Sequence, residues 1–118
     1  MAKALFTPCV TVGDLVFVAG QRGAVDGQIV KGGIRAEVKQ ALANLEKFLA
    51  AEDLSLREIV KVTVYLVDLE ENVAAMNEAY LEVMGTILPA RTTVGIAALT
   101  GDALVAIDVI ARAVPLPS

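Results

Sequence analysis

The chain has no histidine, no tryptophan and only one cysteine, Cys9, among its 118 residues. Zinc and most transition-metal sites draw three or four ligands mainly from His and Cys, so a site of that kind is excluded within one chain. The same absences exclude a Ser-His-Asp triad and a Cys-His dyad. General acid or base chemistry must therefore come from carboxylates, Lys, Tyr or water.

Positive charge is scarce as well. The chain has 10 Lys and Arg residues against 14 Asp and Glu, which gives a net charge of -4. Because phosphate backbones are bound by basic patches and these cations do not cluster, we expect no nucleic-acid partner. Long apolar runs and the hydrophobic segment of a signal peptide are also missing, so we expect no membrane role. A single cysteine gives no sign of disulfides, and a reducing cytoplasm is the predicted compartment.

Apolar residues, in contrast, are abundant. They make up 56% of the chain, above the usual share of about 45 to 50%. A chain of this length forms one domain, here residues 1–118, and buries on the order of 65% of its unfolded surface. The apolar surplus predicts surface that other copies of the chain cover.

Apolar periodicity predicts both kinds of secondary structure. Apolar residues recur every three or four positions in 34–51 and 71–84, which predicts two amphipathic helices. Alternation in 60–66 predicts a strand with one buried face, and Ser55-Leu56-Arg57-Glu58 has the form of a capping box. Further strands are predicted, with a hairpin turn at Asp26-Gly27, over 15–19, 28–30, 92–95 and 104–113. This order predicts an α+β fold with both helices on one face of the sheet and other copies on the opposite face.

Two charged residues stand out near the C-terminal end. Asp108 is the single carboxylate of an apolar strand, and a buried charge is costly unless it is paired or serves a special purpose. Arg91 follows a Pro-Ala turn and presents a planar fork suited to gripping a small carboxylate through two hydrogen bonds. One interpretation is a structural ion pair between Arg91 and Asp108, in the sheet or at an interface. The other is a ligand site in which Arg91 holds an acid and Asp108 holds a water molecule.

Several segments carry a family likeness. The strongest are Pro89-Ala90-Arg91-Thr92-Thr93-Val94 and Ile107-Asp108-Val109-Ile110-Ala111. Further matches occur at Ala19-Gly20-Gln21, over 59–69 and at Met76-Asn77-Glu78-Ala79-Tyr80. Together they resemble the RidA (YjgF) family of reactive imine and enamine deaminases over nearly the whole chain, so residues 1–118 are interpreted as one RidA-like domain.

The resemblance implies a chorismate mutase-like fold. This is a single α+β domain whose mixed, mostly antiparallel sheet carries two helices on one face and assembles into a homotrimeric barrel. Three ligand clefts then lie between subunits. The implied activity is hydrolysis of small 2-imino acids, such as 2-iminobutanoate and 2-iminopropanoate, to 2-keto acids and ammonia. An imine carbon is already electrophilic, so a held carboxylate and an aligned water suffice, and no metal or cofactor is expected.

The resemblance also implies roles for individual residues. Arg91 binds the substrate carboxylate, and Asp108 positions the attacking water. Asn77 supports the site, while the backbone near Gly20 and the Thr93 region line the cleft. From its residue type alone, Gly20 is equally well an ordinary turn glycine.

Two departures from the family pattern bear on these roles. Cys9 stands in the cleft where the family commonly has a tyrosine, and without His it is a poor nucleophile. Asp108 replaces the usual glutamate and reaches one methylene less far, and a displacement of ~1 Å can lower the rate ~100-fold. The alternative function is therefore a non-catalytic trimer that binds a small carboxylate or has a regulatory role. A third interpretation is a structural oligomer in which Arg91 and Asp108 pair at the interface.

Overall fold

The computed structural model describes residues 5–113 of the protein. Its strands are β1 Cys9–Val12, β2 Leu15–Arg22, β3 Ala24–Val25, β4 Gln28–Ile29, β5 Ile59–Val67, β6 Ala90–Ile96 and β7 Val105–Arg112, and its helices are α1 Gly33–Ala50 and α2 Leu69–Met84. Two short 3-10 helices, η1 Leu56–Glu58 and η2 Thr100–Asp102, precede β5 and β7.

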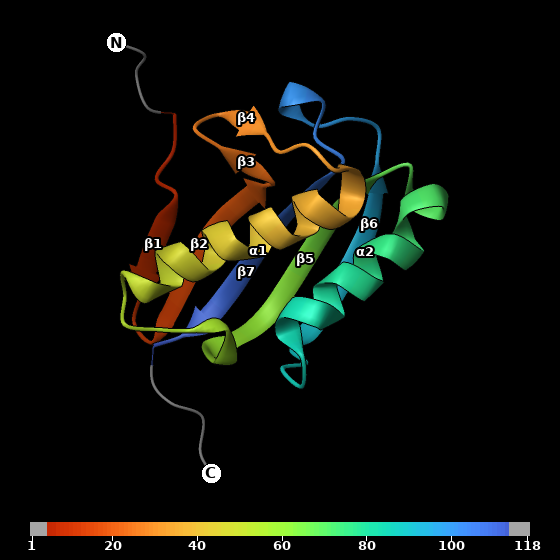
Figure 1. Ribbon diagram of the computed structural model, residues 1–118. Coiled ribbons are helices and arrows are strands. Elements are labelled where there is room, and N and C mark those ends of the chain that lie inside the picture. The colour runs from red at the N-terminus through yellow and green to blue at the C-terminus, as the bar shows by residue number, and fades with distance from the viewer. Residues whose placement is uncertain (1–4, 114–118) are drawn as a thin grey trace.

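One mixed sheet organises these elements. Its strand order is β1-β2-β7-β5-β6, and β3 and β4 form a separate small hairpin. β5 and β6 are parallel and are connected through α2, whereas the other neighbours in the sheet are antiparallel. Figure 1 shows α1 and α2 lying together across one face of the sheet. The predicted α+β fold with both helices on one face is therefore confirmed.

The hydrophobic core lies between the helices and the sheet. Successive residues of a strand point to opposite faces, and Val62, Val64 and Leu66 of β5 are completely buried. The same alternation in β7 and the apolar stripe of α1 complete most of the core: Val105, Ile107, Val109, Ala111, Val38, Ala41, Leu42, Leu45 and Leu49. Burial of each large aliphatic side chain contributes roughly 1.5–3 kcal/mol, so these alternating positions fix which face of each strand meets the helices.

Most predicted elements agree with the structure to within a few residues. The capping box is confirmed, because the backbone N–H of Ser55 donates to Glu58 Oε1 at 2.7 Å and Ser55 Oγ accepts from the Arg57 N–H at 3.2 Å. The turn at Asp26-Gly27 joins β3 to β4 as predicted. α2 begins at Leu69, two residues earlier than predicted. The edge strand β1 has only four residues, too few for a clear alternation, and the sequence does not single it out.

The sheet face opposite the helices is open and partly apolar. Large aliphatic or aromatic side chains on this face are 37 to 60% exposed: Val10, Val12, Leu15, Phe17 and Val94. An exposed apolar face of a sheet is typical of a surface that packs against a partner. This arrangement supports the expected association of copies, while the trimer stays a prediction.

The described residues also bear on membranes and metals. Between residues 5 and 113, no helix is both long and apolar enough to cross a membrane. Within the same range, no three His, Cys, Asp or Glu side chains are grouped as metal ligands would be. The cytoplasmic compartment and the lack of a nucleic-acid partner stay predictions.

Glu37 of α1 is a buried carboxylate that joins the helix to the sheet. Its side chain is only 4% exposed, and Oε1 accepts the backbone N–H of Leu104, just before β7, at 2.8 Å. Gly23 packs directly beneath it, because a Cβ at Gly23 would lie 2.5 Å from the Glu37 Cα. Burial raises the pKa of Glu37 above its ordinary 4.5, and the hydrogen bond from Leu104 opposes that rise only in part.

The raised pKa predicts a pH-dependent stability at Glu37. A carboxyl whose pKa is higher in the folded than in the unfolded chain stabilises the fold while protonated, so that stability is lost as the pH rises from about 4.5 through the folded pKa. Glu37→Gln cannot ionise, yet its amide oxygen still accepts the Leu104 N–H. In urea unfolding, the free energy of unfolding of Glu37→Gln should therefore increase relative to that of the wild type as the pH rises across that window.

The control for this measurement is Glu46→Gln, an exposed glutamate on the same helix. It shows how far the loss of one negative charge from α1 changes the free energy of unfolding, and this change is subtracted from that of Glu37→Gln at each pH. If the remaining difference in unfolding free energy between Glu37→Gln and the wild type does not change with pH, the raised pKa of Glu37 is contradicted.

Candidate functional site

Arg91 is held at the surface by α2. It lies in β6, immediately after Pro89 and Ala90 turn the chain into that strand. Its Nη2 donates to Asn77 Oδ1 at 2.6 Å, and its guanidinium carbon lies 4.9 Å from the centre of the Tyr80 ring. A cation above an aromatic face is attracted by the ring quadrupole, and the hydrogen bond adds a second restraint. Asn77 and Tyr80 therefore hold the guanidinium in one orientation.

Arg91 lines a cavity of about 290 Å³. Its walls are Asn77, Tyr80, Leu81, Leu88, Pro89 and Arg91. Among residues 5–113, the ion pairs are Arg35 with Glu78 and Lys39 with Glu82, and no carboxylate neutralises Arg91. A guanidinium with spare donors beside a mostly apolar cavity is suited to an acid from outside the chain.

Two buried hydroxyls lie in the elements that surround Arg91. Thr93 lies two residues farther along β6 on the same face as Arg91, and Tyr80 lies on α2. Thr93 Oγ1 and Tyr80 Oη are both buried without a hydrogen-bond partner among residues 5–113. Burial raises the pKa of Tyr80, and the charge of Arg91 opposes that rise. An unsatisfied buried hydroxyl costs about 1–3 kcal/mol, so this region favours a bound polar group.

Asp108 lies in β7 and points to the open face of the sheet. Its Oδ2 accepts a hydrogen bond from Tyr65 Oη of β5 at 3.0 Å. This hydrogen bond and the negative charge of Asp108 raise the pKa of Tyr65, because both favour the neutral phenol. Asp108 also lines a cavity of about 350 Å³ together with Thr7, Val10, Phe17, Val18, Ala19, Val109 and Ile110. One carboxylate oxygen is thereby oriented from within the chain.

Arg91 and Asp108 lie on opposite faces of the sheet. Paired residues of neighbouring strands share a face, and Val62 of β5 pairs with both Arg91 and Val109. Thr63, the next residue, pairs with Asp108 and therefore points the other way. An ion pair between Arg91 and Asp108 within one chain was one interpretation of the sequence, and it is wrong because period-two alternation separates them. A pair between copies stays a prediction.

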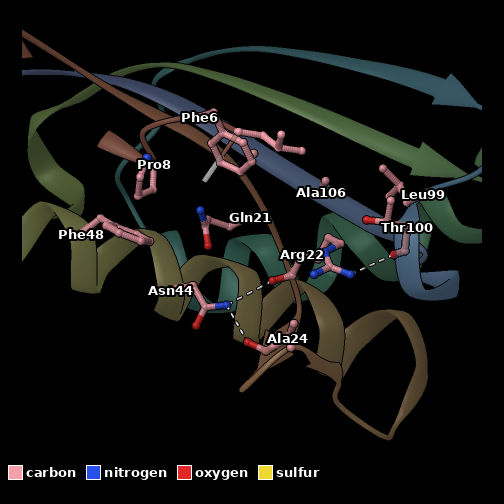
Figure 2. A pocket seen from close by; sticks show the side chains of 13 residues that line it. Phe6, Pro8, Gln21, Arg22, Ala24, Asn44, Phe48, Leu99, Thr100 and Ala106 are labelled. Atoms are coloured by element: carbon pink, nitrogen blue, oxygen red, sulfur yellow. Dashed lines mark hydrogen bonds between the residues drawn. The ribbon is translucent and has the colours of Figure 1, made fainter. Parts of the chain in front are cut away.

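Gly20 and Cys9 occupy different surroundings. Gly20 lies where the register of β2 shifts between Val18 and Gln21, and it lines a third cavity of about 800 Å³ (Figure 2). Its neighbour Ala19 lines the Asp108 cavity, so Gly20 lies between the two. Cys9 is partly buried against the core on the helix side of β1. Burial, followed by the charge of Glu52, raises the pKa of its thiol, which disfavours the thiolate.

Sequence reasoning missed the supporting roles of two tyrosines. Tyr80 belongs to the apolar stripe of α2, but its spacing of three residues from Asn77 also puts both side chains on one side of the helix. Tyr65 alternates with buried valines of β5, a pattern that assigns it to the open face without naming its partner. In the register of the sheet, Tyr65 pairs with Ala106, and Ala106 lies two residues before Asp108 on the same face of β7. The sequence alone does not give this register.

Comparison with known proteins identifies the family. Residues 1–113 match the family described as Endoribonuclease L-PSP. This chain belongs to the Endoribonuclease L-PSP family. Among its L-PSP relatives, a RutC family protein of Pyrococcus horikoshii is 39% identical over 109 residues, which are 90% of this chain and 85% of that protein. The Homo sapiens 2-iminobutanoate/2-iminopropanoate deaminase is 33% identical over 113 residues, which are 94% of this chain and 82% of that enzyme.

A solved structure agrees with this L-PSP membership. E. coli TdcF with bound serine is similar to this chain with a TM-score of 0.85 and 28% identity, over 94% of this chain and 90% of TdcF. The resemblance to the RidA (YjgF) family is thereby confirmed. The relatives support a family in which some members are imine deaminases, while the reaction of this L-PSP chain is a separate question.

The contact between Tyr65 and Asp108 predicts a tyrosine titration. In a Tyr80→Phe background, Tyr65 is the single phenol of the chain, which has two tyrosines in all. Its pKa should lie above the ordinary 10.0 and fall toward that value when Asp108→Asn removes the negative charge. Ultraviolet absorbance of the phenolate measures both midpoints. Asp26→Asn, in the β3–β4 turn, is the matched control, and equal midpoints with and without the Asp108 carboxylate would refute the contact.

Proposed function

We propose that this protein hydrolyses small 2-imino acids to 2-keto acids and ammonia, without a metal or organic cofactor. The observation that carries the proposal is the guanidinium of Arg91, oriented by Asn77 and Tyr80 beside a cavity and not neutralised by a carboxylate among residues 5–113. The human relative is a deaminase of this type, and TdcF is a neighbour with bound serine, itself a small carboxylate. The proposal retains the cytoplasm predicted from the sequence.

The proposed reaction uses few groups. Arg91 donates two hydrogen bonds to the substrate carboxylate, which locates the imine carbon. Asp108 accepts a hydrogen bond from a water molecule and takes its proton as the water oxygen bonds to that carbon. Starting from a protonated imine, that proton then passes to the amino nitrogen of the tetrahedral adduct. The C–N bond breaks and ammonia leaves, while Asp108 accepts the remaining hydroxyl proton as the carbonyl forms and passes it to the departing ammonia. Asn77, Thr93 and the backbone at Gly20 line this cleft, with Cys9 behind it.

The proposed cleft lies between copies of the chain. Because Arg91 and Asp108 are on opposite faces of one sheet, a single chain does not present both to one substrate. The exposed apolar side chains of the open face provide a surface on which another copy can pack. We propose a homotrimer in which Arg91 of one copy meets Asp108 of the next.

The second candidate is a non-catalytic trimer that binds a small carboxylate or regulates another protein. The short Asp108 side chain favours it, because its carboxylate reaches one methylene less far than the glutamate that the family resemblance implies. Arg91 then acts only as an anion clamp. RNA cleavage, which the family description names, is not part of either proposal, because the net charge is -4 and the sequence contains no cluster of Lys and Arg.

A deaminase assay tests the main proposal. A pyridoxal-phosphate dehydratase generates 2-aminoacrylate or its four-carbon analogue, and the appearance of keto acid is followed with and without this protein. Arg91→Ala should lower kcat/KM by at least ~100-fold, because two charge-assisted hydrogen bonds are lost. Asp108→Glu should raise the rate by up to ~100-fold if reach is limiting.

Arg35→Ala, which removes an exposed arginine paired with Glu78, serves as the control and should leave the rate unchanged. No acceleration by micromolar wild-type protein rejects the enzyme. Thermal stabilisation by small carboxylates that disappears in Arg91→Ala would then support the binding protein. Absence of both effects leaves the structural oligomer.

Mixing two inactive variants tests whether the site is shared between copies. Arg91→Ala and Asp108→Asn are each expected to be inactive, but a mixed trimer contains interfaces in which both native residues meet. In random assembly at equal amounts, each of the two residues is native in half of the subunits. About a quarter of the interfaces therefore contain both native residues, and about a quarter of the wild-type activity should return. Activity that stays at the level of the single variants after unfolding and joint refolding would contradict the shared cleft.

A further inference from the structure

A cavity away from Arg91 and Asp108 has features of a second ligand site. It has a volume of about 800 Å³ and lies among the segment before β1, the end of β2, α1 and the loop at η2 (Figure 2). Its walls are Leu5, Phe6, Pro8, Gly20, Gln21, Arg22, Ala24, Gly27, Asn44, Phe48, Leu99, Thr100 and Ala106. It shares no lining residue with the cavities of Arg91 and Asp108, and its volume is in the usual range of about 300–1,000 Å³ for small-molecule sites.

Arg22 provides the cavity with its positive charge. It is the only charged residue of the lining, and none of the lining residues is acidic. Its Nη1 donates to the carbonyl oxygen of Thr100 at 3.0 Å, and it forms no ion pair with residues 5–113. A guanidinium has five N–H donors, so most of them are not used by this contact. A partly buried guanidinium without a carboxylate partner favours an anion at this position.

The walls around Arg22 are firmly connected to the fold. Asn44 of α1 donates through Nδ2 to the carbonyl oxygens of Arg22 at 3.1 Å and Ala24 at 2.9 Å, as Figure 2 shows. Gln40, one turn earlier, donates to Asn44 Oδ1 at 2.9 Å and fixes the orientation of that amide. The end of β2 that carries Arg22 is thus tied to the helix. A site that is formed before the ligand arrives loses less entropy on binding.

Apolar groups provide the rest of the contact surface. Phe6 and Phe48 approach from two sides of the cavity, with Leu99 near Arg22 (Figure 2). Phe6 is 69% exposed, so a ligand that covers its ring would remove apolar area from water. The single cation matches one negative charge, whereas a phosphate dianion is usually held by several cations or by a group of backbone N–H donors.

We propose that this cavity binds a monocarboxylate with an aromatic or branched apolar tail. Arg22 holds the carboxylate, and Phe6, Phe48 and Leu99 contact the tail. The charged groups of this site differ from those of the proposed imine hydrolysis, because neither Arg91 nor Asp108 lines the cavity, and Gly20 is where the two sites adjoin. The competing explanation is that Arg22 serves only to hold the η2 loop through Thr100, close to which Gly101 leaves room for the guanidinium.

Calorimetric titration with phenylacetate tests this site. All proteins carry Arg91→Gln, so that binding at the other arginine does not contribute, and the result does not depend on the proposed deaminase. Arg22→Gln should weaken phenylacetate binding about tenfold or more, because the charge-assisted hydrogen bonds are lost. Phenylacetamide has the same tail without the charge. Its affinity for the protein that retains Arg22 should be no higher than the affinity of phenylacetate for Arg22→Gln.

Arg22→Gln also removes the hydrogen bond to Thr100 and could weaken binding by disturbing the loop at η2, so a second variant is needed. Phe6→Ser changes an exposed residue ahead of β1 and should weaken binding about threefold or more while leaving the melting temperature unchanged. Amide chemical-shift changes on adding phenylacetate should be centred on Gln21 and Thr100, which line this cavity and not the cavities of Arg91 and Asp108. Failure of phenylacetate to bind the Arg22 protein, or equal binding by Arg22→Gln, overturns the proposal and leaves Arg22 as a support for the loop.

Discussion

Period-two alternation of the central strands is the constraint from which the rest of this structure follows. In β5 and β7, one set of side chains enters the core with α1 and α2, and the intervening set necessarily points to the open face. A shift of one residue in register would exchange the two sets and place Asp108 in the core, which the cost of an unpaired buried carboxylate forbids. The packing that stabilises the fold thus also places Arg91 and Asp108 on opposite faces of the sheet.

The surroundings of Arg91 show how helix packing supports a charged group at the surface. α2 presents Asn77 and Tyr80 three residues apart, so one side of the helix supplies both the hydrogen bond and the aromatic ring. Met76 and Ala79, the residues just before these, are completely buried and anchor the same helix to the core. The two groups that contact the guanidinium are thereby attached to a well-packed helix. A ligand bound there would meet a donor whose geometry is already set.

Much of the fold could be predicted from local patterns, because alternation and helical spacing are properties of neighbouring residues. The two helices, the capping box at Ser55 and the strand that carries Asp108 belong to this class. The candidate site could be predicted only in part from the sequence. Motif residues such as Arg91 and Asn77 can be recognised, but their contacts depend on the strand register and on the position of the helix. The hydrogen bond from Tyr65 to Asp108 joins residues 43 apart. The cavity at Arg22 likewise joins the ends of elements that are distant in the sequence.

The link between Tyr65 and Asp108 bears directly on how Asp108 would act on water in the proposed hydrolysis. A carboxylate has two oxygens with about four lone-pair positions, and Tyr65 occupies one position on Oδ2. The other positions remain available to a water molecule, while the phenol restricts rotation of the carboxylate about its bond to Cβ. Hydrolysis of a protonated imine depends more on alignment of the water than on a strong base, because the carbon is already electron-poor. A short acid that is held in place by a phenol is therefore better suited to imines than to unactivated carbonyl substrates.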